Sequence, residues 1–577
     1  MTLPVVSISG KKKKKPSLVL TLSGAGLLIG SGIAAYWLLT AGKPSSSLPV
    51  GANIIPEDAL FTVSLSTDTN QWDKLRSFGT KQSQAALDKS LVQWRDRFLA
   101  KEGFDFQKDV SPWVGDQVTV AILAPQEPKT PPEAVPVPSD EKLAPVEQSM
   151  VMVLPIQDQN KAQTAFAQPK ALKGKWVDRE YEGITIKEAE STSGEKLSTA
   201  IIEERFLIIA DNPKATERTI KAYKSKATLA NGVGFAKHLP QIATYQPLAQ
   251  FYVNIPSAAQ IAGTTSAKTR LPAQVLAQLK NNQGLAGTVS LESQGLRFKG
   301  VSWLKPNSQR VLAVENKATT MTTRLPASTL MMFSGGNLRR LWADYVSTAQ
   351  KNPLSPVNPE ELRSGFKNLS GLDLDGDLLS WMGGEFAVSI IPDAPNKDIP
   401  QDVRVALVFM VQASDRQKAE TSLKQLDDAM RTQYQFTIKE EKAGEVPVVR
   451  WIGPSGTLTA THGWLDKDVA FLTLGTPVTE KILPKPKNIL ANADSFHKAL
   501  PQEVNPVNGQ FFLDMEGAAK SLSLPALFPQ QQNFLNAINS IGVTTAVSDS
   551  RTTRYDVLLE LKKGEKPPQL SSSKESE

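Results

Sequence analysis

The chain of 577 residues contains no cysteine and only three histidines. Without cysteine it can form no disulfide and no thiolate nucleophile, and it cannot bind a metal through sulfur. Attachment of a lipid to an N-terminal cysteine is excluded as well. Any chemistry of the protein must therefore rest on its carboxylates, amines, hydroxyls and apolar side chains.

The three histidines, His238, His462 and His497, are too few and too scattered for most catalytic sites. They form no His-x-x-x-His pair of the kind that binds zinc, and no Gly-x-Ser-x-Gly motif offers a serine nucleophile. After residue 40 the chain has neither a P-loop nor a Gly-x-Gly-x-x-Gly turn that opens a helix. We expect no enzyme and no cofactor, although paired carboxylates that hydrolyse glycosides stay an open alternative.

An excess of basic residues is confined to one tail. The formal net charge is +7, and the run Lys11–Lys15 supplies five of these charges, which leaves +2 for the rest of the chain. A nucleic-acid-binding protein carries its positive charge across a folded surface. The sequence therefore predicts no nucleic-acid partner.

Residues 17–40, SLVLTLSGAGLLIGSGIAAYWLLT, carry no charged side chain. About 20 apolar residues span a bilayer as a helix, and a preceding lysine run stays on the cytoplasmic side. We expect a single-pass anchor in an inner (plasma) or thylakoid membrane, with the bulk of the chain periplasmic or lumenal. A cleaved signal peptide is the alternative. Gly26 and Gly30 form a Gly-x-x-x-Gly motif, which makes a homodimer through this helix possible.

Two stretches of the sequence are nearly the same. GFDFQKDVSPWVGDQVTVAIL (103–123) aligns without a gap with GLDLDGDLLSWMGGEFAVSII (371–391). Six further pairs of segments match in the same order, from 54–65 with 324–335 to 287–304 with 542–561. The repeat signature consists of five identical pairs: Gly103 and Gly371, Asp105 and Asp373, Asp109 and Asp377, Trp113 and Trp381, Gly115 and Gly383.

A repeat unit of about 250 residues is a duplicated domain and not a short solenoid module. We predict a basic tail (1–16), the anchor (17–40), a linker (41–53), a first domain (54–306) with a proline-rich loop (125–148), a linker (307–322), a second domain (323–563) and a tail without structure (564–577). Short apolar or β-branched runs recur in each unit, several leading into helices through polar caps. The fold class predicted is α+β, with mainly antiparallel sheet and helices packed on one face.

Two parts of the repeat signature invite a functional interpretation. DLDGD (373–377) resembles a calcium loop, but a glycine at the sixth position and an acid at the twelfth are missing, so turn and cap roles are favoured. The first copy also has Gln107 where the second has Asp375. A tryptophan before a strand can be a ligand platform, yet large aromatics beside a sheet are more often core anchors.

With its apolar N-terminal span, its IIPEDALFTVSLSTDTNQW opening and its LDLDGDLLSWMGGEFAVSI line, the chain resembles an uncharacterised family of membrane-anchored proteins common in cyanobacteria. The resemblance implies an envelope or thylakoid setting and assigns no catalytic residue. Our first hypothesis is a non-catalytic scaffold or assembly factor that binds an unidentified envelope or membrane protein. The alternatives are a carrier or sensor of an apolar ligand, such as a lipid or pigment, and a carboxylate-based hydrolase.

Overall fold

Most of the chain beyond the predicted anchor is described by the structure, a computed structural model. The described residues are 48–95, 106–124, 148–167, 176–190, 196–232, 234–264, 281–308, 310–312, 314–315, 317–349, 358–393, 405–456, 458–500, 507–521 and 532–566. The predicted anchor at 17–40, with Gly26 and Gly30, lies outside them. Within those ranges, no helix is both long and apolar enough to cross a membrane.

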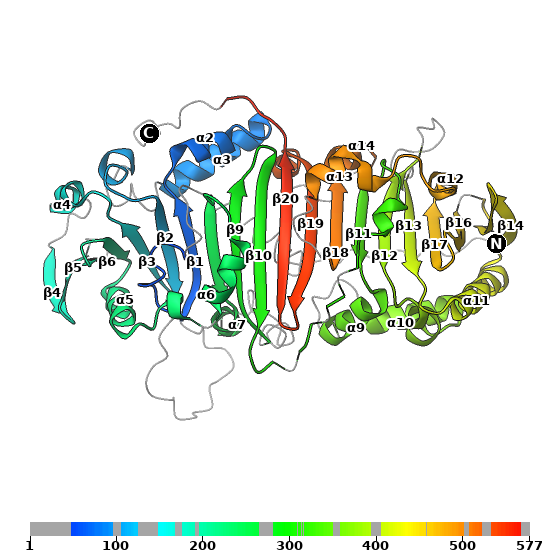
Figure 1. Cartoon of the computed structure of the whole chain (residues 1–577), viewed down its shortest axis with the longest axis horizontal. Helices are drawn as coiled ribbons and strands as arrows, with labels where there is room; N and C mark the ends of the chain where they lie inside the picture. The colour runs from blue at the N-terminus through cyan, green and yellow to red at the C-terminus, as the bar shows by residue number, and fades with distance from the viewer. Residues whose placement is uncertain are drawn as a thin grey trace, which may run out of the picture.

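Twenty strands form a single antiparallel sheet that runs the length of the molecule (Figure 1). The first half contributes β1 (Ala59–Ser66), β2 (Gln117–Leu123), β3 (Ser149–Pro155), β4 (Val177–Tyr181), β5 (Ile184–Glu190), β6 (Lys196–Ile202), β7 (Phe206–Ala210), β8 (Ala249–Asn254), β9 (Asn282–Leu291) and β10 (Gly295–Leu304). The second contributes β11 (Met331–Gly335), β12 (Phe386–Pro392), β13 (Val405–Gln412), β14 (Thr437–Ala443), β15 (Val446–Ile452), β16 (Thr459–Trp464), β17 (Val469–Gly475), β18 (Gly509–Asp514), β19 (Ile538–Asp549) and β20 (Thr552–Leu561). The predicted α+β class with antiparallel sheet is confirmed.

Both halves arrange their strands in the same order. The spatial order is β4-β5-β6-β7-β3-β2-β1-β8-β9-β10 in the first half, and β14-β15-β16-β17-β13-β12-β11-β18-β19-β20 in the second. The register agrees as well: Phe61 pairs with Ile122 and Val253, and its match Met331 pairs with Ile390 and Leu513. Residues that occupy the same place in the two sheets are called counterparts below.

Most of the helices that the structure describes also recur in pairs. Those of the first half are α2 (Thr69–Arg76), α3 (Lys81–Arg95), α4 (Gln159–Ala167), α5 (Pro213–Ser225), α6 (Phe235–His238) and α7 (Ile255–Thr264). Those of the second are α9 (Leu338–Ala349), α10 (Pro359–Ser370), α11 (Arg416–Tyr434), α12 (Thr479–Ile482), α13 (Asp494–Ala499), α14 (Met515–Ser521) and α16 (Gln532–Leu535). Among the described helices, α16 is the exception to this pairing. Counterpart aspartates, Asp158 and Asp415, begin α4 and α11, because each carboxylate accepts a hydrogen bond from a backbone N–H three residues on.

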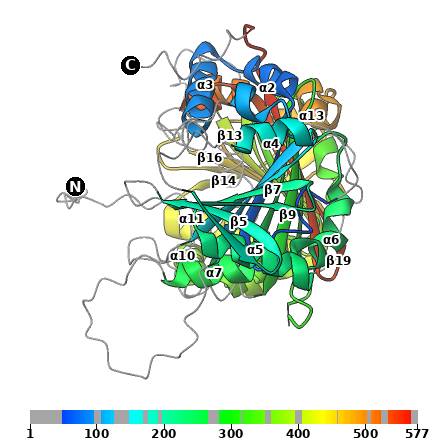
Figure 2. The same ribbon diagram turned by 90° about the vertical axis from the view of Figure 1, so that its left-hand side faces the viewer.

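Helices cover both faces of the sheet, so the prediction of helices on one face is wrong. In β3, Val151 and Val153 pack in one apolar cluster with Ile220 of α5, whereas Met152 packs in another with Trp72 of α2. A strand whose successive side chains are all buried needs cover on each side. Figure 2, seen from the end of the first half, shows the strands between an upper group of helices with α2 and α3 and a lower group with α5 and α7.

The two halves meet where β10 pairs with β20. Each is the last strand of its half, so the pairing relates the halves by a half-turn: α2 and α3 lie above the sheet on the left of Figure 1, and α9 and α10 lie below it on the right. Inside this seam Arg297 donates to Asp556 through Nε at 2.9 Å and Nη2 at 2.5 Å. Both residues are buried, with 4% and 3% of their surface exposed.

The seam yields a stability prediction. Asp556→Ala removes the carboxylate that accepts two hydrogen bonds from the buried Arg297 guanidinium, and should cost about 3–5 kcal/mol of unfolding free energy. The double variant Arg297→Met/Asp556→Leu removes both charges and should recover most of that loss. Urea unfolding of the full chain measures both effects. Glu516→Ala, which breaks the exposed pair with Lys520, is the control and should change little; equal stability of the single and double seam variants would contradict the prediction.

Candidate ligand-binding cavity

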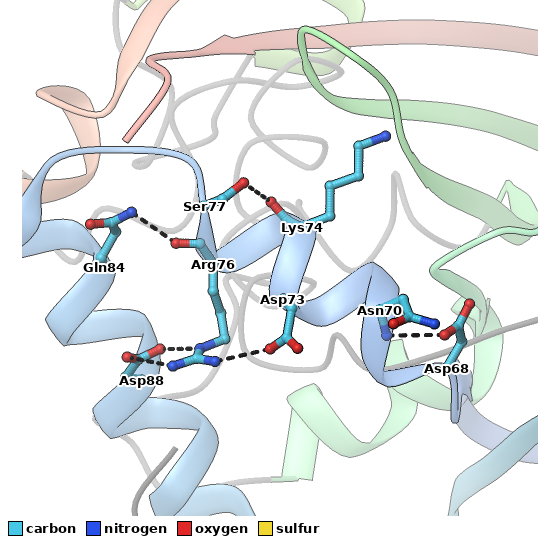
Figure 3. Close-up of polar contacts among 8 residues, drawn as sticks. All are labelled: Asp68, Asn70, Asp73, Lys74, Arg76, Ser77, Gln84 and Asp88. Atoms are coloured by element: carbon cyan, nitrogen blue, oxygen red, sulfur yellow. Dashed lines mark hydrogen bonds and ion pairs between the residues drawn. The ribbon is translucent and has the colours of Figure 1, made fainter. Parts of the chain in front are cut away.

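In the first half, α2 and α3 are fixed tightly to each other and to the sheet. Arg76 is buried and donates to Asp88 through Nε at 2.6 Å and to Asp73 through Nη1 at 3.0 Å (Figure 3). Its backbone carbonyl accepts a hydrogen bond from Gln84 of α3 at 2.9 Å. The apolar side of α2, including Trp72, is buried against the sheet.

In the second half, a different residue ties the equivalent helices together. Asp375, in the turn η6 (Leu374–Leu378), accepts hydrogen bonds from Trp342 Nε1 of α9 at 2.6 Å and from Arg363 Nε of α10 at 2.5 Å. The Arg363 guanidinium also lies 5.7 Å from the centre of the Trp342 ring. These bonds to Arg363 and Trp342 lower the pKa of Asp375 despite its partial burial. Trp342, the counterpart of the buried Trp72, is only half-buried here.

The acids of the repeat signature in the second half, Asp373 and Asp377, bind the backbone next to them. Asp373 accepts from the N–H of Gly376 at 2.6 Å, and Asp377 accepts from the N–H of Asp373 at 2.8 Å. Asp109 contributes its carbonyl to a bond described below, while Gly103 and Asp105 lie outside the described residues. Among the residues that the structure describes, no group of three His, Cys, Asp or Glu side chains could hold a metal.

The two signature tryptophans occupy the same place in their halves. Trp113 and Trp381 are each 1% exposed, and their carbonyls accept hydrogen bonds at 2.8 Å from the backbone N–H of Gln157, just after β3, and of Ser414, just after β13. Their indoles differ. Trp113 Nε1 donates to the Asp109 carbonyl at 2.5 Å, whereas Trp381 lies in the wall of the cavity described next.

Close packing explains why glycine occupies two of the signature positions. A Cβ on Gly115 would lie 3.1 Å from a carbon of Pro155, and one on Gly383 would lie 3.0 Å from the Ser414 hydroxyl. Gly371 ends α10 with a φ of 74°, a conformation that favours glycine.

A cavity of about 650 Å³ lies between the sheet and the helices of the second half. Its sheet side is formed by β13, β15, β16 and β17, and its helix side by α10, α11 and the turn η7 (Leu379–Trp381). None of the 21 lining residues is charged, and the only hydroxyl among them belongs to Tyr434. Ligand pockets in proteins have volumes of roughly 300–1,000 Å³ and mostly apolar walls.

Helix α10 supplies an apolar stripe to this cavity. Leu362, Phe366 and Leu369 follow one another at spacings of four and three residues, which places them on one side of the helix. Phe366 and Leu369 line the cavity, yet Leu369 remains 45% exposed and Leu362 39%. Helix α10 therefore covers the cavity only in part.

Helix α11 is held to the sheet by a polar contact at the margin of the cavity. Asp427 accepts hydrogen bonds from Trp451 Nε1 of β15 at 2.6 Å and from His462 Nε2 of β16 at 2.7 Å. His462 is buried, and Trp451 and His462 meet edge to face at 5.4 Å. One carboxylate oxygen therefore fixes two strands to α11. These hydrogen bonds help to set the distance between the helix wall and the sheet wall of the cavity.

The first half has different side chains at two positions of this cavity wall. Ala470, in the cavity wall, has the buried Leu207 as its counterpart. Phe409, whose partner in β12 is Val388, has the buried Met152 as its counterpart. A space of about 70 Å³ lies beside Leu207 in the first half. The two copies of the fold therefore differ in the residues that they place at these positions of the sheet.

Exposed apolar side chains gather around the same region. Twelve large apolar side chains are exposed among the described residues, and seven of them lie in the second half: Phe333, Leu341, Leu362, Leu369, Leu407, Leu458 and Leu474. Of these, Leu369, Leu458 and Leu474 line the cavity. Large apolar patches on a soluble surface mark binding sites more often than chance exposure. Sequence reasoning missed this site, and the signal that could have found it is the difference between counterpart residues, such as alanine in place of leucine.

A family model described as "Protein of unknown function (DUF3352)" matches residues 21–561. The chain belongs to this family. The resemblance to an uncharacterised family predicted from the sequence is thereby confirmed, and it assigns no activity. No curated protein matches the chain.

Crystal forms I and IV of TP0453 are among the solved structures that match. Form I is 10% identical with a TM-score of 0.24, and the match covers 46% of this chain and 82% of that one. Form IV is 12% identical with a TM-score of 0.23, covering 48% and 90%. Similarity at this level carries no argument about function.

The Asp375 contact predicts a pH dependence. Because its pKa is lowered in the folded chain, Asp375 stabilises the α9–α10 arrangement above its ordinary pKa of 3.8, and this contribution is lost as the pH falls through the lowered value. Asp375→Asn should remove the charge at all pH values. We expect faster hydrogen exchange in 338–349 and 359–370 in this variant at pH 7, and a difference from the unmodified chain that shrinks in acid.

Residues 69–95, which contain α2 and α3, are the internal control and should exchange at the same rate in both proteins. Identical exchange of α9 and α10 in the variant and the unmodified chain at pH 7 would show that Asp375 does not hold these helices.

Proposed function

We propose that the protein is a non-catalytic carrier or sensor of a small apolar ligand, which binds in the cavity of the second half. One observation carries the proposal: a preformed space of about 650 Å³ in the second half has no charged residue in its lining. An apolar ligand gains roughly 25 cal/mol for each Å² that it removes from water.

The chemistry of the walls supports binding without catalysis. The lining contains no carboxylate, histidine, lysine or arginine, so it offers no general acid, base or nucleophile beyond the Tyr434 hydroxyl. A carboxylate-based hydrolase needs two acids facing each other across its cleft. Asp375 and Asp427, which hold elements of the walls in place, are already committed to neighbouring helices and strands.

The proposal extends to the setting of the protein. The uncharged segment at 17–40 would anchor the chain in a plasma or thylakoid membrane, with the cavity on the periplasmic or lumenal side. An apolar ligand is scarce in water and abundant in a membrane, so a tethered cavity is well placed to receive one. Binding of an envelope protein as a scaffold remains a separate prediction.

Filling the cavity tests the proposal. Ala470→Leu introduces the residue that occupies this place in the first half, and Ala460→Leu adds the same volume on the neighbouring strand. Because the added carbons enter empty space, the double variant should fold and should lose apolar ligand by about tenfold or more. Native mass spectrometry of the purified full chain would measure the apolar mass retained per protein.

Ala343→Leu, which adds the same side chain at an exposed position of α9, is the matched control and should retain ligand like the unmodified chain. An unmodified chain that carries no apolar compound and takes up none when one is supplied would contradict the proposed function. So would a double variant that retains the ligand fully.

A further inference from the structure

Aromatic side chains are concentrated in the cavity wall. Seven of the 21 lining residues are aromatic, in a chain in which aromatic residues make up 7%. Building on the proposed function, we infer that the ligand is a flat, conjugated apolar molecule, a polyene or a chain bearing an unsaturated ring, and not a saturated hydrocarbon chain.

These aromatic residues stand on both walls of the cavity. Phe409 of β13 and Trp451 of β15 belong to the sheet wall, while Phe366 of α10 and Tyr434 at the end of α11 belong to the helix wall. A molecule in the cavity therefore lies between aromatic groups on opposite sides. A conjugated ligand can stack on ring faces or meet ring edges along its whole length.

The fold does not require aromatic residues at two of these positions. The counterpart of Phe409 is Met152, and the counterpart of Trp451, by its place in the sheet, is Ala189. Both Met152 and Ala189 are buried in the first half. Trp381 does not distinguish the two halves, because its counterpart is also tryptophan. On the sheet wall, Phe409 and Trp451 are therefore aromatic in the half that holds the cavity and replaced by smaller or aliphatic side chains in the other half.

A saturated and a conjugated ligand differ in the contacts that they make with aromatic side chains and in the conformational freedom that they lose on binding. A saturated chain gains the same burial energy from leucine as from phenylalanine, because that energy follows the apolar area. A conjugated ligand gains aromatic contacts in addition, and its rigid bonds lose less conformational freedom on binding. The volume has room for about twenty groups of methylene or water size, at about 30 Å³ each.

Two fatty acids of equal length and equal head group separate these cases. Parinarate has 18 carbons and four conjugated double bonds, and stearate is its saturated form. We expect parinarate to bind the full chain at least about fivefold more tightly than stearate. Energy transfer from the wall tryptophans to parinarate reports occupancy of the cavity, and competition by stearate gives the ratio of affinities.

Phe436 is another aromatic residue of the lining. Phe409→Met, which installs the first-half residue, together with Phe436→Leu should reduce this preference to about twofold or less while stearate binding is retained. Phe333→Met, on the same side of the sheet but outside the lining, should leave the preference unchanged. If the double variant fails to fold, Phe409→Met alone repeats the test, because methionine is accommodated at the counterpart position.

The outcomes separate the two proposals. Equal affinities for parinarate and stearate, or a preference that survives loss of Phe409 and Phe436, would overturn the inference about ligand class and leave the proposed function standing. Failure of both fatty acids and of any other apolar compound to bind would overturn the proposed function itself. A preference for parinarate that follows the aromatic residues would support both.

Discussion

The pairing of β10 with β20 determines the shape of the whole molecule. An antiparallel unit of ten strands has two edges, and an open edge is a site for pairing with another chain. Each half joins one edge to the other half, and its outer edge is β4 or β14, where charged residues such as Arg179 and Lys439 disfavour further pairing. The buried bond between Arg297 and Asp556 lies inside this junction. A mispaired seam would bury the guanidinium without its carboxylate, so the pair favours one register over the alternatives.

Joining two copies through one sheet allows them to serve different purposes. In the first half α2 and α3 are held by Arg76, and Leu207 of β7 is buried. The second half contains the cavity, and open apolar space lowers stability because the surrounding atoms lose contacts. A sheet shared with a well-packed partner tolerates this loss better than a lone domain, whose whole free energy of unfolding is only about 5–15 kcal/mol. Duplication thus permits a cavity that would take a larger share of the free energy of unfolding from a single copy.

Much of the fold could be predicted from the sequence, because it depends on local pattern. Runs such as 117–123 and 250–255 are apolar or β-branched, and the structure has strands β2 and β8 at these places. Strand β4, Val-Asp-Arg-Glu-Tyr, offers no such run, because an edge strand needs little apolar surface. The helices on both faces of the sheet were not predicted. The apolar run of β3 indicates buried side chains, but it does not indicate what covers each face of the strand. The cavity could not be predicted, since it arises from residues far apart in sequence, such as Phe366 and Ala470.

The cavity keeps its shape through polar contacts placed just outside it. Asp375 joins α9 to α10, and Asp427 joins α11 to β15 and β16, whereas the lining between them is apolar. Apolar contacts are not directional, so walls held by them alone would move together and close the space. Hydrogen bonds to a carboxylate fix both distance and direction. A ligand that enters walls already held apart pays little to order them, so its affinity reflects the contacts that it makes with the lining side chains.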